Sequence, residues 1–163
     1  MSGSEFRLLA EDIRTDLGNL SRLKQEIEQI LGNLRGVPSK VELRAMASIL
    51  HDFYCGAERI LERVALGMDG GMPGGPEWHT QLLIRMGSEI QGVRPAVLSP
   101  RLVSTLKEYL RFRHLFRNIY GFELEWQKIQ ELVRSLAETH GLFTKDMAAF
   151  LDFLKALTRT TST

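Results

Sequence analysis

The strongest constraint on the fold is a series of apolar residues that recur every three or four positions near the start of the chain. These residues are Leu9, Ile13, Leu17, Leu20, Leu23, Ile27, Ile30 and Leu34, and charged residues occupy many of the positions between them. A period of about 3.6 residues places such a series on one side of an α-helix. The spacing therefore predicts one long amphipathic helix over residues 5–34.

Turn-forming residues separate this segment from a second helix. Gly36 and Pro38 are typical of a helix end. Ser39, followed three residues later by Glu42, has the spacing of a capping box, which opens a helix. A second helix is therefore predicted over residues 40–67, and its wide apolar arc favours a central position in a bundle.

A glycine-rich stretch, GMDGGMPGGP at residues 67–76, follows the second helix. Its glycines invite comparison with a phosphate-binding loop, but no Gly-Lys-Ser/Thr follows it and no strand precedes it. The stretch is instead predicted to be a mobile loop between helices.

The rest of the chain is also predicted to be helical. The predicted segments run from residue 76 or 77 to about 90, from 99 to about 120, from 124 to 139 and from 144 to 158. Ser99 and Pro100 form a good N-cap and first-turn pair, and Gly141 separates the last two segments. No segment has the alternation of paired strands. We therefore predict an all-α fold, an antiparallel helical bundle of five to six helices.

These helices are predicted to form one domain over residues 7–158. The opening MSGSEF, residues 1–6, resembles the scar of a cloning junction and is predicted to be vector-derived. Residues 159–163 are predicted to be a disordered tail.

The composition excludes several classes of protein. With 44% hydrophobic and 25% charged residues, the chain has the balance of an ordinary globular protein, and 21 basic against 20 acidic residues leave no strong overall field. No apolar run approaches the roughly 20 residues that span a bilayer, and the N-terminus lacks the layout of a signal peptide, so we expect a cytoplasmic protein without membrane contact. One cysteine and four scattered histidines have no metal-ligand spacing, so neither a metal nor a cofactor is predicted.

Projected on a helical wheel, the predicted fourth helix has two apolar stripes, one of which becomes polar. The first stripe, predicted to be core, consists of Phe112, Leu115, Phe116 and Ile119. The second begins with Leu102, Leu106 and Leu110 and continues with Arg113, Arg117 and Tyr120. A stripe that changes from leucine to arginine and tyrosine predicts that this end of the helix lies along a cleft or a subunit interface.

Basic residues are concentrated in the same helix. Between residues 107 and 117 the chain has four of them and one glutamate: Lys107, Arg111, Arg113 and Arg117 beside Glu108. Such a concentration would suit a phosphate backbone. His114 and Asn118 lie one turn apart on the outer side. The alternative is that these groups are solvated or paired with acids, as on most amphipathic helices.

Four segments of the chain resemble the HepT-like proteins, a ribonuclease-toxin branch of the helical HEPN superfamily. The segments are HDFYCGAERILERVA (51–65), PEWHTQLL (76–83), RPAVLSP (94–100) and LRFRHLFRNIYGFEL (110–124). The resemblance spans nearly the whole chain, from about residue 8 to 157, and the order of four segments makes it more specific than one motif. It implies a HEPN-like bundle in which Trp78 and His79 pack or line a cleft.

The superfamily signature is an arginine, roughly four to six further residues and then a histidine, which HepT-type toxins follow with a tyrosine. In this sequence Arg113 takes the arginine position and Tyr120 the tyrosine position. Asn118 stands at the histidine position, and asparagine cannot exchange a proton near neutral pH. His114, one turn before Asn118, is then the available group for proton transfer.

The resemblance implies a metal-independent RNA endonuclease, in which a ribose 2′-hydroxyl attacks the adjacent phosphorus and leaves a cyclic phosphate and a 5′-hydroxyl. Arg113 and Arg117 are expected to stabilise the charge that develops on the phosphate. His114 is expected to move protons, and Asn118 to orient the 2′-hydroxyl or a phosphate oxygen. The residues expected to bind RNA are Lys107 and Arg111.

The resemblance also implies two protein partners. HEPN proteins generally form a homodimer in which two copies of this helix face each other, and the wide angle between Arg113 and Asn118 around the helix favours such a composite site. HepT-type toxins are typically encoded beside a minimal nucleotidyltransferase antitoxin that transfers AMP to the motif tyrosine, here Tyr120. The transferred group would add bulk and negative charge where RNA phosphate binds.

The sequence is compatible with three functions. The first is the RNA endonuclease toxin of a type II toxin–antitoxin pair, active or weakened by Asn118. The second keeps the fold without catalysis, as a helical module that binds RNA or a nucleotidyltransferase. The third is a helical scaffold whose long first helix mediates assembly.

Overall fold

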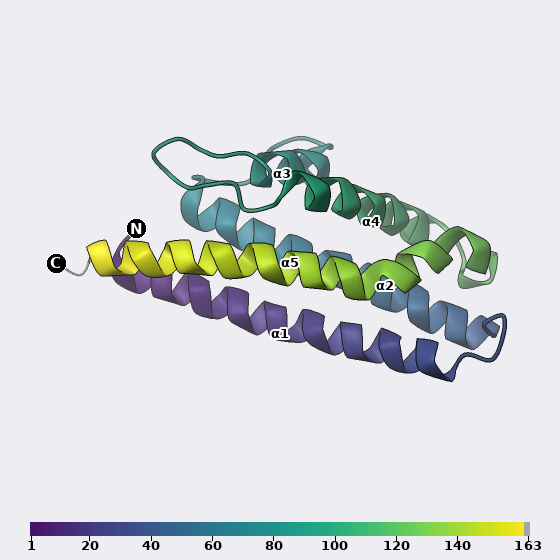
Figure 1. Cartoon of the computed structure of the whole chain (residues 1–163). Coiled ribbons are helices and arrows are strands. Elements are labelled where there is room, and N and C mark those ends of the chain that lie inside the picture. The colour runs from purple at the N-terminus through teal and green to yellow at the C-terminus, as the bar shows by residue number, and fades with distance from the viewer. Residues whose placement is uncertain (162–163) are drawn as a thin grey trace.

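The computed structural model describes residues 1–161, in which five α-helices form an antiparallel bundle (Figure 1). The four long helices, which alternate in direction along the chain, are α1 (Gly3–Asn33), α2 (Lys40–Met68), α4 (Pro100–Asn118) and α5 (Trp126–Thr160). The short α3 (Trp78–Met86) packs against α2 and α4. This range contains no β-strand, which confirms the all-α prediction with five helices. None of these helices is both long and apolar enough to cross a lipid bilayer.

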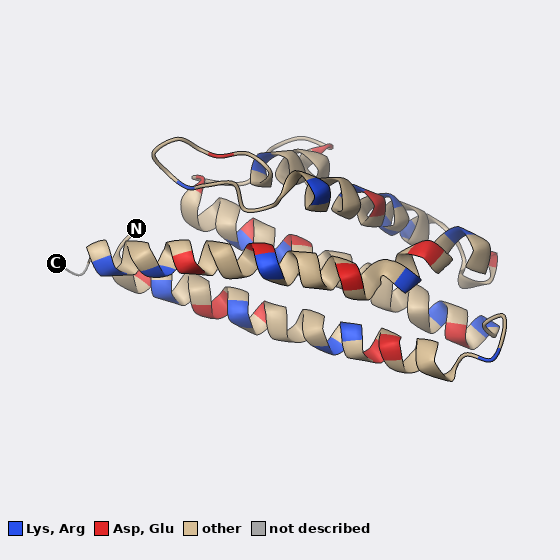
Figure 2. Ribbon diagram, viewed as in Figure 1, with Lys and Arg blue, Asp and Glu red and all other residues tan. Residues whose placement is uncertain are grey.

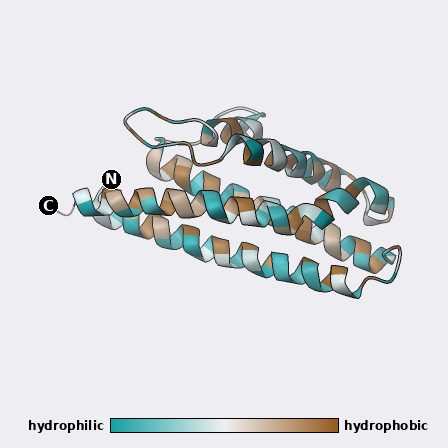
Figure 3. Ribbon diagram, viewed as in Figure 1, coloured by the Kyte–Doolittle hydropathy of each residue, from teal (hydrophilic) through white to brown (hydrophobic). Residues whose placement is uncertain are grey.

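α2 lies at the centre of the bundle, as its wide apolar arc predicts. It contacts every other α-helix. Its first turn has the predicted capping box: the Glu42 amide donates to Ser39 Oγ at 3.1 Å, and the Ser39 amide donates to the Glu42 carboxylate at 2.9 Å. Figure 3 shows hydrophobic and hydrophilic residues alternating along the turns of the long helices, so each helix has an apolar side to bury.

α1 packs its apolar side against α2 and α5. The buried side chains of this side include Phe6, Leu9, Ile13, Leu20 and Ile27. Residues 1–6, predicted to be vector-derived, begin this helix: Ser2 is its N-cap and Phe6 packs in the core. The origin of this segment stays a prediction.

The last two predicted helices are a single helix, so the prediction of a break at Gly141 is wrong. α5 continues through Gly141 and buries side chains on both sides of it, from Ile129 to Leu154. A helix-interior glycine costs about 1 kcal/mol relative to alanine. Burying even one leucine or phenylalanine contributes more than that, so packing against α1 outweighs the local propensity.

α5 also extends further than predicted at its C-terminal end. The helix ends at Thr160, so the predicted tail of residues 159–163 is helical over its first two positions. Thr161 closes the helix by donating its amide to the Leu157 carbonyl at 3.1 Å. Residues 162 and 163 lie outside the described residues.

The buried side of α4 confirms Phe112 of the predicted core stripe, which is 5% exposed, while Phe116 and Ile119 of that stripe pack partly buried against the core. The buried side is centred on the second apolar stripe, where Leu102, Leu106, Tyr109 and Leu110 are buried. Leu115, predicted to be core, lies nearly opposite the centre of that stripe on the helix and is 43% exposed. The helix ends at Asn118, two residues earlier than predicted, because Ile119 is extended (φ −125°, ψ 159°). The 3₁₀ turn η1 (Gly121–Glu123) then leads to α5.

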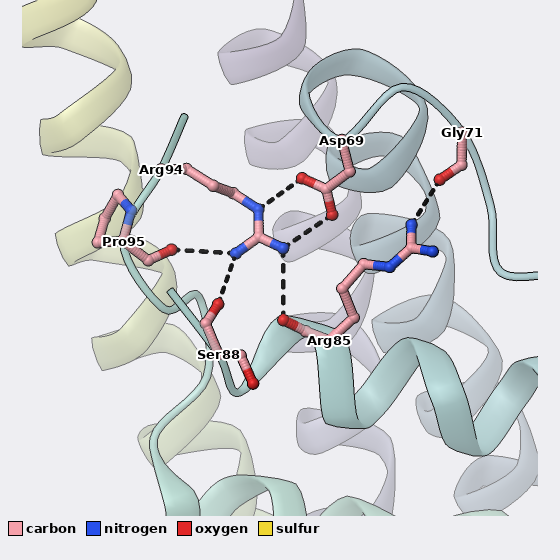
Figure 4. A network of polar contacts seen from close by, with 6 residues as sticks. All are labelled: Asp69, Gly71, Arg85, Ser88, Arg94 and Pro95. Atoms are coloured by element: carbon pink, nitrogen blue, oxygen red, sulfur yellow. Dashed lines mark hydrogen bonds and ion pairs between the residues drawn. The ribbon is translucent and has the colours of Figure 1, made fainter. Parts of the chain in front are cut away.

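A buried ion pair fixes the segment that connects α2, α3 and α4 (Figure 4). Arg94 donates to both carboxylate oxygens of Asp69, at 2.7 and 2.8 Å, and the two side chains are 0% and 1% exposed. The same guanidinium donates to three backbone carbonyls, those of Arg85, Ser88 and Pro95. The pair therefore ties the end of α2 to the end of α3 and to the crossover that follows.

α3 ends at Met86, four residues before the predicted end. The chain turns after Gly87, and Ile90 exchanges backbone hydrogen bonds of 3.0 Å with Arg94. Arg85 of α3 also donates to the Gly71 carbonyl at 2.6 Å (Figure 4). This hydrogen bond attaches the glycine-rich loop to α3 at Gly71.

Replacing Arg94 by methionine is expected to destabilise the fold by about 3–5 kcal/mol, because Asp69 would keep a buried charge without its partner. Urea unfolding followed by circular dichroism measures this loss. The matched control is Arg101→Met, since Arg101 forms an exposed ion pair with Glu138 whose loss is expected to cost about 1 kcal/mol or less. Equal losses in the two variants would contradict a structural role for the buried pair.

Candidate functional site

Arg113 of α4 turns toward α2 rather than into solvent. Its side chain is half-buried, and its Nε is buried without a hydrogen-bond partner among the described residues. Its positive charge acts on the ionisation of Tyr54 and Glu62, both on α2. Arg113 therefore continues the buried stripe of α4, as the wheel predicts, and brings a cation to the α2 surface.

The same part of α2 carries a buried carboxylate, Glu58, which is 5% exposed. One of its oxygens, Oε2, accepts two hydrogen bonds, from the Tyr54 hydroxyl at 2.8 Å and from His79 Nδ1 at 2.7 Å. Burial, together with the negative charge of Glu58, raises the pKa of Tyr54 well above its ordinary value. The phenol therefore stays protonated and donates to Glu58 throughout the physiological pH range.

His79 joins α3 to this cluster and also meets α4. Its ring stacks on Trp78, with centroids 3.6 Å apart and an interplanar angle of 27°. The ring of His114 stands edge-on to it, at 6.2 Å and 89°. Only 15% of the His79 side chain is exposed, whereas His114 is exposed. Two imidazoles from different helices thus lie side by side.

Glu62 extends the cluster by one turn of α2. Burial and the negative charge of Glu58 raise its pKa, and the nearby charges of His79, Arg59 and Arg113 oppose the rise. We call the following residues the Glu58 cluster: Tyr54, Glu58, Glu62, His79, Arg113 and His114. Within residues 1–161 no group of three or more His, Cys, Asp or Glu side chains is placed to hold a metal ion.

The other predicted site residues of α4 lie outside this cluster. Arg117 and Asn118 are exposed, and Asn118 Nδ2 donates to the carbonyl of His114 at 2.6 Å. Tyr120 lies beyond the helix, is 70% exposed and stacks on Phe122, with centroids 5.2 Å apart. Of the predicted site residues, Arg113 and His114 thus belong to the Glu58 cluster, whereas Arg117, Asn118 and Tyr120 lie on the surface outside it.

The residues predicted to bind RNA occupy the middle of α4. Arg111 is exposed and forms an ion pair with Glu108, and Lys107 is half-buried. Figure 2 shows Lys and Arg recurring along α4. A pocket at the C-terminal end of α4 is lined by residues that include Arg44, Phe116 and Ile119. Neither Arg113 nor Arg117 lines this pocket. RNA binding by Lys107 and Arg111 stays a prediction.

Glu58 is a residue that the sequence analysis does not single out, whereas His79 is expected there only to pack or to line a cleft. Glu58 lies one turn after Tyr54 and within the apolar arc of α2, where a carboxylate is unusual, and this position is a signal readable from the sequence. For His79 the sequence gives no sign of the pairing with Glu58, which lies 21 residues away across the glycine loop. Its pairing with Glu58 depends on how α3 packs against α2.

A family model described as HepT-like protein matches residues 45–154. The matched range begins in the second turn of α2, contains α3 and α4, and ends within α5. It includes the whole Glu58 cluster and leaves out α1. No curated protein and no solved structure matches the chain.

The substitution Tyr54→Phe is expected to destabilise the protein by about 1.5–3 kcal/mol, because it removes one of the two donors to a buried charged oxygen. The control is Tyr109→Phe. Tyr109 is equally buried but donates to a neutral acceptor, the Leu132 carbonyl at 3.3 Å, so its loss is expected to cost about 1 kcal/mol. Urea unfolding of both variants checks the order, and a larger loss for Tyr109→Phe would contradict the greater contribution of the hydrogen bond to Glu58.

Proposed function

Because the chain belongs to the HepT-like family of HEPN-type helical proteins, we propose that it is a metal-independent RNA endonuclease, the toxin of a type II toxin–antitoxin pair. The observation that carries the proposal is the pair of imidazoles, His79 and His114, beside the partly buried guanidinium of Arg113. Cleavage of a phosphodiester needs a group that moves protons near neutral pH and a cation for the charge that develops on phosphorus. The Glu58 cluster contains both kinds of group.

In the proposed reaction the ribose 2′-oxygen forms a bond to the adjacent phosphorus and the bond from phosphorus to the 5′-oxygen breaks. The products are a 2′,3′-cyclic phosphate and a 5′-hydroxyl. Arg113 and Arg117 stabilise the developing charge, and His114 takes part in proton transfer. Asn118 orients the substrate through its free Oδ1, since Nδ2 is engaged with the helix backbone. The remaining basic residues, Lys107 and Arg111, bind the RNA backbone.

A homodimer is part of the proposal. In one protomer Arg117 and Asn118 lie at the surface, outside the Glu58 cluster. Two copies of α4 that face each other through this surface would bring the exposed Arg117 of each copy toward the other. This arrangement would also supply four arginines to one RNA-binding groove.

The proposed antitoxin is a minimal nucleotidyltransferase that modifies Tyr120. The phenol oxygen would attack the α-phosphorus of ATP, pyrophosphate would leave, and the protein would carry AMP. The exposure of Tyr120 and its position just beyond the last turn of α4 support this role, because a transferase could reach the phenol. The added negative charge would compete with RNA phosphate near Arg117.

Co-expression with the proposed nucleotidyltransferase antitoxin is expected to increase the intact mass of the protein by about 329 Da per transferred AMP. The variant Tyr120→Phe keeps the aromatic stack and lacks the acceptor oxygen, so its mass is expected to stay unchanged. An equal increase in the mass of Tyr120→Phe would mean that another residue is the acceptor.

A second function, a helical module that binds RNA or the nucleotidyltransferase without catalysis, is favoured by one observation. Asn118 cannot exchange protons and its amide is turned back onto its own helix. Under this alternative the wild-type protein binds RNA without forming product, and Asn118→His gains activity. Either function would be carried out in the cytoplasm, where messenger and transfer RNA are available.

The unmodified dimer is expected to cleave single-stranded RNA without added metal, and Arg113→Ala or Arg117→Ala to lower the rate about 100-fold or more. Arg101→Ala is the control, because Arg101 is an exposed arginine in the first turn of the same helix and pairs with Glu138. Gel analysis of end-labelled RNA measures the rate and identifies the cyclic phosphate. Equal rates for the three variants would contradict the assignment of the arginines, and no cleavage by the wild-type protein would contradict the enzymatic proposal.

A further inference from the structure

Glu58 is a buried charge whose position packing alone does not explain. A carboxylate removed from water costs several kcal/mol unless it is paired and hydrogen-bonded. Here one oxygen, Oε2, receives both the Tyr54 hydroxyl and His79 Nδ1, and Arg113 adds a positive charge to the same region of α2. An apolar side chain would fill this position at lower cost, so the retained charge points to a task for its partner, His79.

The hydrogen bond to Glu58 determines how the His79 imidazole is presented. A carboxylate only accepts hydrogen bonds, so Nδ1 carries the proton and the lone pair of the neutral ring is at Nε2. Trp78 covers one face of the ring at 3.6 Å and holds its orientation. No hydrogen bond to Nε2 is found within residues 1–161, and 15% of the side chain remains exposed. The His79 imidazole is therefore held in a fixed orientation, and the lone pair of its Nε2 has no hydrogen-bond partner within residues 1–161.

The other two groups considered for proton transfer lack this orientation. His114 is exposed, and no hydrogen bond of its ring is found in the part of the chain that the structure describes. Asn118 has no group that titrates near neutral pH, and its amide is bound to a backbone carbonyl. The rings of His79 and His114 meet edge to face with centroids 6.2 Å apart, which is the separation expected of two groups that act on one phosphodiester.

We propose that His79 is the general base of RNA cleavage and that Glu58 is its positioning residue, an assignment that rests on the proposed function. The proton of the ribose 2′-hydroxyl moves to His79 Nε2 as the 2′-oxygen bonds to phosphorus. The bond to the 5′-oxygen breaks, and that oxygen receives a proton from the His114 imidazolium. The histidine that the family motif places at position 118 is thereby replaced by one from α3.

The test compares pH–rate profiles of kcat/KM for the wild-type dimer and the variant His79→Asn on end-labelled RNA. The asparagine amide keeps a donor near the position of Nδ1, so the fold is retained, but the base is lost. A fall of about 100-fold or more is expected, together with the loss of the acid limb, because no base remains to be protonated. The matched control is His140→Asn, which changes a partly buried histidine on α5 and is expected to keep both rate and profile.

The variant Glu58→Gln tests the positioning role separately. It removes the anion beside the imidazole, so the acid limb is expected to move to lower pH while RNA binding is unchanged. The groups that face His79 and contribute to its profile are Tyr54, Glu58 and Glu62 on α2, and Arg113 and His114 on α4. An acid limb that does not move in Glu58→Gln would overturn the positioning role.

The two proposals fail in different ways. If the wild-type protein cleaves RNA and folded His79→Asn cleaves it with the same profile, His79 is not the base, while the proposed function stands. If His79→Asn unfolds, the pH–rate profile of Glu58→Gln decides between the outcomes. A shift of its acid limb to lower pH supports His79 as the base. An unchanged acid limb overturns the assignment of His79. If the wild-type protein does not cleave RNA, the proposed function fails and the role of His79 fails with it.

Discussion

The buried ion pair between Arg94 and Asp69 is the constraint on which the candidate site depends. α3 has only nine residues and no side-chain cap at its start, so it cannot be stable by itself. Arg94 binds backbone carbonyls at the end of this helix and fastens them to the end of α2. Burial of Leu82, Leu83 and Met86 completes the attachment. The position of His79 in the first turn of α3 follows from these contacts.

Glu58 then fixes the orientation of the His79 imidazole through a hydrogen bond to Nδ1. The carboxylate lies in the apolar arc of α2 and accepts hydrogen bonds from donors on two helices. Burying it is less favourable than burying an apolar side chain, but its hydrogen bonds fix the geometry of the donors. Arg113 approaches from α4 with its Nε buried and unpaired. Three helices, α2, α3 and α4, therefore contribute charged or titratable groups to the Glu58 cluster. A bundle without α3 would keep Arg113 and lose the imidazole that is hydrogen-bonded to Glu58.

The parts of the structure that could be predicted from the sequence are those that local pattern decides. The capping box of Ser39 and Glu42 and the start of α4 at Pro100 depend on neighbouring residues only. Gly141 misled the prediction because packing along α5 overrides the low helix propensity of one glycine. The helical-wheel projection predicted that Arg113 points inward. The pairing of Glu58 with His79 could not be predicted in this way, because it depends on which sides of α2 and α3 pack together and the periodicity of each helix does not determine that.

The central claim, that RNA is bound where His79 and His114 meet, can be tested by NMR of the histidine side chains. The chain has four histidines, and His140, which packs near Phe53 outside the Glu58 cluster, serves as the internal reference. A short RNA with a methyl group on each 2′-oxygen lacks the attacking hydroxyl, so it binds without being cleaved and is titrated into the labelled protein. We expect the imidazole resonances of His79 and His114 to shift together and saturate at one RNA concentration, with His140 unchanged. Binding that leaves both His79 and His114 unshifted would contradict the account.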